Sequence, residues 1–133
     1  MITVKRLTIL LACAVLMCAA TLSYAAEPDG TPWQGFMDAA TSPKLLAGCA
    51  AADVLTTAYA VHVGIAREAN PLLAKAVNAH HFLPLLLAKF AYVGVIWWVY
   101  EQYRESQLIK AGVGVTSAVT CGVAIHNALL IVK

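Results

Sequence analysis

The chain has 133 residues, of which 61% are hydrophobic and only 12% are charged, and its net charge is +2. A soluble domain carries about twice that charged fraction, so the composition argues against one. The small net charge and the lack of a basic cluster argue against a nucleic-acid partner. The mean hydropathy is +0.74, and apolar runs of about twenty residues alternate with short polar breaks. This pattern predicts an all-α integral membrane helical bundle in contact with the lipid bilayer.

Residues 1–25 have the features of a secretory leader. Lys5 and Arg6 precede an apolar run, and a small-x-small sequence at 23–25 provides a cleavage site before Ala26. The segment is either a cleaved signal peptide or a retained signal-anchor helix. Both alternatives keep Lys5 and Arg6 in the cytoplasm and place the chain that follows outside.

Residues 26–44 are the one stretch with the character of a soluble segment. It contains residues that interrupt helices, namely Pro28, Gly30, Pro32 and Pro43. Trp33 is apolar among polar neighbours and suits the level of the lipid headgroups. We therefore expect an exported segment that lies on the outer membrane surface.

The remaining chain, 45–133, is predicted to form a transmembrane domain of three helices at 45–66, 82–103 and 111–132. Each contains 22 residues, which span about 33 Å as a helix, enough to cross the bilayer. Small residues four apart let another helix backbone approach closely. The first span has such a face at Gly48 and Ala52, and the third has one at Gly114, Ala118 and Gly122.

The connector between the first two spans contains a helix start. Asn70 can cap a helix and Pro71 suits its first position, so we expect a short helix at 72–79. Five basic residues fall on the predicted inner side and three on the outer side. This bias favours a bacterial inner-membrane protein with the mature N-terminus outside and the C-terminus inside.

Charged side chains inside the spans mark the candidate functional region. Asp53 lies near the middle of the first span, and Thr56 and Thr57 follow three and four residues later on the same face. Lys89 lies inside the second span. An ionised group at that depth costs about 3 kcal/mol unless it is paired. Lys89 has two candidate partners, Asp53 and Glu68, and the sequence does not choose between them.

Further polar residues share the inner half of the bilayer by residue count. Asn127 and His126 lie in the third span, and His62 lies near the inner end of the first. His62 and His126 could hold a haem between two helices. Lone histidines in spans are more often hydrogen-bonded packing residues, so we expect no haem, no other cofactor and no metal site.

The four cysteines, Cys13, Cys18, Cys49 and Cys121, all lie in apolar runs. None forms a C-x-x-C pair, so we predict buried packing residues instead of disulfides or metal ligands. Hydrolase and phosphate-binding motifs are missing from the sequence. We therefore expect no catalytic residue.

The motifs D-V-L-T-T at 53–57, E-A-N-P-L-L at 68–73 and L-L-L-A-K-F at 85–90 resemble those of a family of small prokaryotic membrane proteins. The family is catalogued as a domain of unknown function with about three spans. The resemblance covers roughly residues 45–132 and implies a fold but no activity. It implies signature positions at Asp53, Thr57, Glu68, Asn70, Pro71 and Lys89, with Asn127 as a further partner.

The sequence leaves two functional hypotheses open. In the first, the protein is an accessory or interaction subunit whose small-residue faces pack against a larger membrane complex or other copies of itself. In the second, it is a minimal carrier or channel for ions, protons or small solutes that uses Asp53 and Lys89. The polar residues could equally form a buried pair that fixes how the helices align.

Overall fold

The computed structural model describes residues 32–68 and 70–132, and within them the chain is helical without strands. The helices, in chain order, are α2 (Pro32–Ala40), α3 (Pro43–His62), α4 (Pro71–Asn78), α5 (Leu83–Gln102) and α6 (Gln107–Val132). The helices α3, α5 and α6 are long and apolar enough to cross a membrane. The prediction of an all-α bundle with three such helices is confirmed. The leader predicted at 1–25 lies outside the described residues.

The helix boundaries follow from capping residues. Ser42 caps α3, because its hydroxyl accepts a hydrogen bond of 3.0 Å from the Lys44 amide, and Pro43 takes the first position. As expected, helix structure is interrupted directly before Pro43, because proline is accommodated at a helix start but not in a helix interior. At the other end, Gly64 adopts a φ of 75°, a left-handed conformation that suits glycine. The helix α3 consequently ends at His62 instead of continuing to residue 66.

The connectors are partly as expected. Asn70 caps α4 by accepting a hydrogen bond of 3.0 Å from the Leu72 amide, as its position before Pro71 predicts. The segment before α3 differs from the prediction, because residues 32–40 form the helix α2. Its glycine, Gly35, is tolerated there, since one glycine costs only about 1 kcal/mol in a helix.

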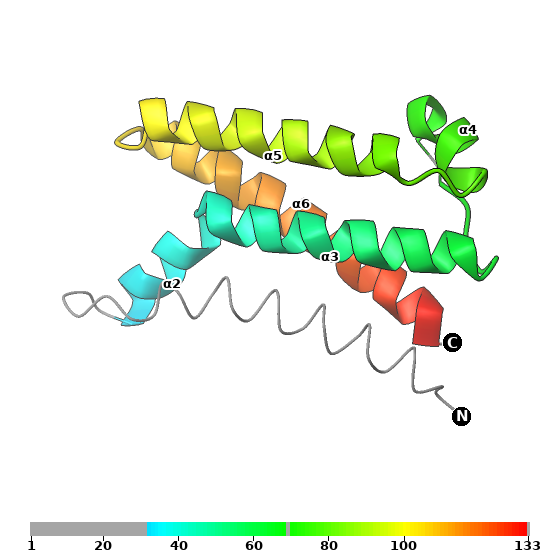
Figure 1. Ribbon diagram of the computed structural model, residues 1–133. Helices are drawn as coiled ribbons and strands as arrows, with labels where there is room; N and C mark the ends of the chain where they lie inside the picture. The colour runs from blue at the N-terminus through cyan, green and yellow to red at the C-terminus, as the bar shows by residue number, and fades with distance from the viewer. Residues whose placement is uncertain (1–31, 69, 133) are drawn as a thin grey trace.

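The helices α3 and α6 form the core of the bundle. Figure 1 shows α3 and α5 side by side, with α6 running obliquely past both. Leu46, Cys49 and Ala52 of α3 and Ile131 of α6 are fully buried. In contrast, α5 has a single buried residue, Leu85, which packs near the connector with Val61 and Val77 in a small cluster. The bundle is therefore a tight helix pair with a third helix attached to it.

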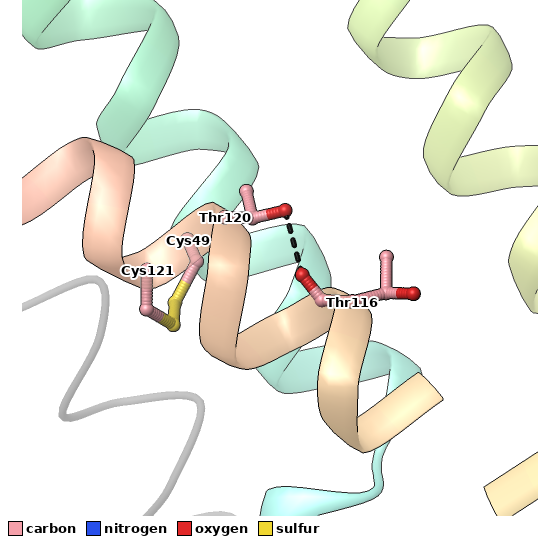
Figure 2. Close-up of a disulfide and its surroundings, with 4 residues drawn as sticks. All are labelled: Cys49, Thr116, Thr120 and Cys121. Carbon is pink, nitrogen blue, oxygen red and sulfur yellow. Dashed lines mark hydrogen bonds between the residues drawn. A yellow bond between two sulfur atoms is a disulfide. The ribbon is translucent and has the colours of Figure 1, made fainter. Parts of the chain in front are cut away.

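A disulfide joins Cys49 of α3 to Cys121 of α6 (Figure 2). The prediction that these two cysteines are only packing residues was wrong. The residues lie 72 positions apart in the sequence and come together only where the two helices cross. Their Cα atoms are 4.8 Å apart, within the range that a disulfide bridges. Cys13 and Cys18 lie outside the described residues.

The small residues predicted for helix packing divide between two environments. Ala52 is buried, Gly48 is half-buried, and Gly114 packs against the turn after α2. A Cβ atom at Gly114 would lie 3.3 Å from the Thr41 methyl group. Ala118 and Gly122 are exposed instead, and a Cβ atom at Gly122 would meet no atom within 4 Å.

Candidate functional site

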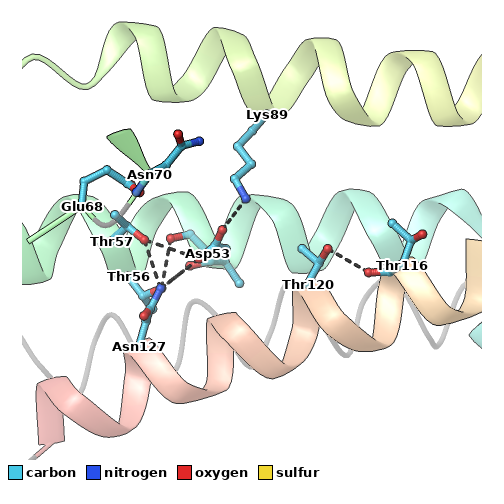
Figure 3. Close-up of polar contacts among 10 residues, drawn as sticks. Asp53, Thr56, Thr57, Glu68, Asn70, Lys89, Thr116, Thr120 and Asn127 are labelled. Atoms are coloured by element: carbon cyan, nitrogen blue, oxygen red, sulfur yellow. Dashed lines mark hydrogen bonds and ion pairs between the residues drawn. The ribbon is translucent and has the colours of Figure 1, made fainter. Parts of the chain in front are cut away.

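An ion pair between Lys89 and Asp53 links α5 to α3. The Lys89 ammonium Nζ lies 2.6 Å from Asp53 Oδ2. Asp53 is the eleventh of the 20 residues of α3, so the pair lies halfway along that helix. Of the two acids that the sequence offers to Lys89, the structure brings Asp53 to it, and Figure 3 shows the lysine side chain bridging the two helices.

The second carboxylate oxygen of Asp53 is held by α6 and by its own helix. Asn127 Nδ2 donates a hydrogen bond of 2.9 Å to Asp53 Oδ1 and another of 3.1 Å to Thr57 Oγ1. Thr57 lies one turn after Asp53 and donates to the same carboxylate oxygen at 3.4 Å. We call Asp53, Thr57, Lys89 and Asn127 the polar cluster. It connects all three long helices.

The local sequence explains how the polar cluster assembles. Residues four apart on a helix share a face, which aligns Cys49, Asp53 and Thr57 along α3. On α6, Cys121 and Asn127 face the same partner helix. The disulfide therefore fixes the alignment of α3 and α6 about one turn before the contact between Asp53 and Asn127.

Burial sets the energetics of the polar cluster. Asp53 is 5% exposed, while the Lys89 side chain keeps 30% of its surface exposed. A carboxylate removed from water requires a counter-charge and hydrogen-bond donors, and Asp53 receives both. Removing one member of a buried pair typically costs about 3–5 kcal/mol, because the other charge is left without a partner. The arrangement can hold helices in a fixed alignment, and it can hold a titratable group inside an apolar bundle.

The other predicted polar residues do not join the polar cluster. The Thr56 hydroxyl donates to the backbone carbonyls of Ala52 and Asp53, at 2.9 and 3.1 Å. Glu68 and Asn70 lie in the connector after α3, where Glu68 Oε1 accepts a hydrogen bond of 2.8 Å from the Asn70 amide.

The Glu68 amide in turn donates to Asn78 Oδ1 at 2.8 Å. Glu68 of the E-x-N-P motif thus links the segment before α4 to Asn78 at the end of α4. No motif in the sequence points to Asn78, although its place at the end of the predicted short helix is compatible with such a role.

The two histidines considered as haem ligands occupy different surroundings. His62 is exposed at the end of α3, and its ring lies edge-on to that of His80, with centroids 5.7 Å apart. His126 is exposed on α6. No cluster of three or more histidine, cysteine or acidic residues suited to a metal ion occurs in the described part of the chain.

A cavity of about 240 Å³ lies between α3 and α5, beside the polar cluster. Three alanines of α3 form part of its wall, Ala47, Ala50 and Ala51, and Phe90 of α5 lies opposite. Lys89 is the one charged residue among the lining residues that the structure describes. The cavity is therefore apolar, with a cation at its edge.

Three long apolar helices around a buried ion pair define a small helical protein with three potential membrane spans. Residues 44–133 match the family described as Domain of unknown function (DUF5658). Because the match covers more than half of the chain, the protein belongs to this family. The predicted resemblance to a family catalogued as a domain of unknown function is confirmed. No curated protein and no solved structure matches the chain significantly.

Proposed function

We propose that this protein is a membrane-embedded interaction subunit. It packs against a larger membrane complex or against another copy of itself through the exposed face of α6. The observation that carries the proposal is the exposure of Ala118 and Gly122 on a helix whose opposite face is closed by α3. Small residues four apart permit close approach of another helix backbone, which is the main source of helix association in a bilayer.

The two faces of α6 differ in their neighbours. The residues of α6 buried in the bundle repeat at intervals of three and four residues, as one helix face does, namely Val113, Ser117, Thr120 and Ala124. Val115 and Leu129 lie on the other side and are 66% and 58% exposed. A second helix could lie along that side without displacing a residue of the core.

A bacterial inner-membrane location, with the N-terminal end of α3 outside, forms part of the proposal. The basic residues Arg67, Lys75 and Lys133 would then lie on the cytoplasmic side, where positive charge is favoured. The disulfide supports this orientation, because Cys49 is in the half of α3 that would face the oxidising outer compartment.

The test compares two glycines that are both open to the surroundings, Gly122 on α6 and Gly94 on α5. The full chain is purified in a mild detergent, and the mass of each complex is measured. Gly122→Leu should shift the protein to a smaller species, because the added side chain blocks close approach. Gly94→Leu is the control and should leave the mass unchanged. Unchanged assembly of Gly122→Leu would contradict the proposal.

A minimal carrier or channel is the second candidate. The observation in its favour is the ion pair of Asp53 and Lys89 inside potential membrane spans, since charges at such depth often mark ion or proton pathways. In this case Asp53→Asn should abolish a proton or cation flux that the wild-type protein supports in lipid vesicles. Equal flux in the variant, or no flux above empty vesicles in either protein, would count against this function.

A further inference from the structure

His126 is a polar residue exposed on the surface of α6, a potential membrane span. Its neighbour Asn127 contacts Asp53 at the midpoint of α3, so His126 lies at nearly the same depth of the bundle. Successive residues point about 100° apart around a helix. Because Asn127 points to α3, His126 is directed away from it. The imidazole is exposed on α6 and makes no hydrogen bond, ion pair or ring contact with another described residue.

An exposed imidazole at that depth requires a partner if α6 crosses a membrane. Hydrocarbon offers no hydrogen bond, and an unpaired polar group there costs about 1–3 kcal/mol. Polar residues in spans accordingly tend to face protein instead of lipid. The surface that carries His126 is therefore expected to be covered by protein.

The same surface has the shape for close helix contact. Ala118, Gly122 and His126 are spaced four residues apart, so they lie along one side of α6. Gly122, in the middle, has open space where a side chain would be. His126 itself lines a half-open surface pocket of about 250 Å³, together with Leu129 and Leu130. A helix that crosses at Gly122 would bring its own groups to His126 one turn later.

We infer that the partner at this surface is a second copy of the chain, in a parallel pair related by a two-fold axis near Gly122. This inference rests on the proposed interaction role of the α6 face and names its partner. Copies inserted in the same membrane have the same orientation, so Gly122 meets Gly122 and His126 meets His126. Closed two-fold pairs are the commonest symmetric assemblies.

The chemistry of the surface suits a pairing with itself. A neutral imidazole carries one donor nitrogen and one acceptor nitrogen, so one His126 can donate to the His126 of the second copy. Residues 111–132 contain no Asp, Glu, Lys or Arg. Two copies therefore bring no formally charged side chains of like sign together along this part of α6. One hydrogen bond then joins the two imidazoles, where lipid offers neither of them any.

The experiment uses two full-length copies with different tags, expressed together and extracted in a mild detergent. Capture of one tag should recover the other. Gly122→Leu in both copies should lower that recovery at least tenfold, and His126→Leu about fivefold. His126→Asn keeps one donor group and one acceptor and should restore most of it. Gly94→Leu is the matched control and should behave as wild type.

A second measurement places the contact on α6 directly. Ala118→Cys copies should form an intermolecular disulfide under mild oxidation, whereas Gly94→Cys copies should not. Each variant is checked for the bond between Cys49 and Cys121, which reports that α3 and α6 still pack together. Absence of the Ala118→Cys cross-link in protein that retains the internal disulfide would overturn the inference.

The outcomes separate the inference from the proposed function. In one outcome, a different protein is captured, its capture is lost with Gly122→Leu, and the second tag is not recovered. This result would disprove the pair of identical copies and support the interaction subunit. A monomer in every variant, with no other protein captured, would contradict both. Recovery of the second tag that is insensitive to Gly122→Leu and His126→Leu would overturn the pairing through α6.

Discussion

The pair of helices α3 and α6 and the helix α5 are held in the protein by different means. Half of the apolar stretch of α3 is buried, compared with 6% of that of α5. The helix pair has interlocking small side chains and a disulfide. About a third of the way along, α5 has one ion pair to α3, and at its start it has a small apolar cluster around Leu85.

This difference shows how close packing and polar contacts each hold helices together. In a bilayer, apolar side chains gain little by leaving lipid for another helix, so close packing and polar contacts hold helices together. Small residues give α3 and α6 that close packing. The larger side chains of α5, such as Phe90 and Trp98, remain mostly exposed. The attachment of α5 therefore depends strongly on Lys89.

Breaking the ion pair should have the largest effect on this comparison. Lys89→Met leaves Asp53 with an uncompensated charge and should lower the free energy of unfolding by about 3–5 kcal/mol. The measurement is an unfolding titration with sodium dodecyl sulfate in mixed micelles. Asp53→Asn should also destabilise, and the double variant should recover part of the loss. A double variant as unstable as the sum of the two single changes would disprove the pairing.

Removing the disulfide should weaken the α3–α6 pair next. Cys49→Ala combined with Cys121→Ala should lower the free energy of unfolding by about 2–4 kcal/mol, because a link across 72 residues restricts the unfolded chain. A membrane-permeable reductant should destabilise the wild-type protein to the same degree and leave the double variant unaffected. Equal stability of the wild-type protein with and without reductant would show that the link contributes nothing.

Truncation of matched leucines sharpens the comparison between the two regions. Leu46 of α3 is completely buried and Leu87 of α5 is 58% exposed. Leu46→Ala should destabilise by about 2 kcal/mol or more, because it leaves a cavity in the helix pair. Leu87→Ala should change the free energy of unfolding by less than about 0.5 kcal/mol. Similar losses in both variants would mean that α5 is as closely packed as α3.

The smallest expected effect concerns a buried hydroxyl between α3 and α6. Ser117 is fully buried, and among the described residues its Oγ has no hydrogen-bond partner. Ser117→Ala removes that unsatisfied group and should raise the free energy of unfolding by up to about 1 kcal/mol. Thr120→Ala is a control, because the Thr120 hydroxyl bonds to the Thr116 carbonyl at 2.9 Å. A loss of 1 kcal/mol in Ser117→Ala would indicate a hydrogen bond to this hydroxyl.

Several features of the fold were predictable because they depend on nearby residues. Helix length follows from continuous apolar runs, and the α4 start follows from Asn70 and Pro71. The end of α3 was placed too late, at residue 66 instead of His62. The reason is Gly64, whose left-handed conformation favours the end of a helix.

The sequence by itself determined an all-α chain with three apolar helices and placed Asp53, Lys89 and Asn127 inside them, because hydropathy and helical spacing are local properties. Only the tertiary structure decided that Lys89 pairs with Asp53 instead of Glu68, that Cys49 bonds to Cys121, and that Gly114 packs inward while Gly122 remains open. Each of these depends on how far one helix slides and rotates against another. A shift of one residue turns a side chain by about 100°, and the one-dimensional pattern does not record that angle.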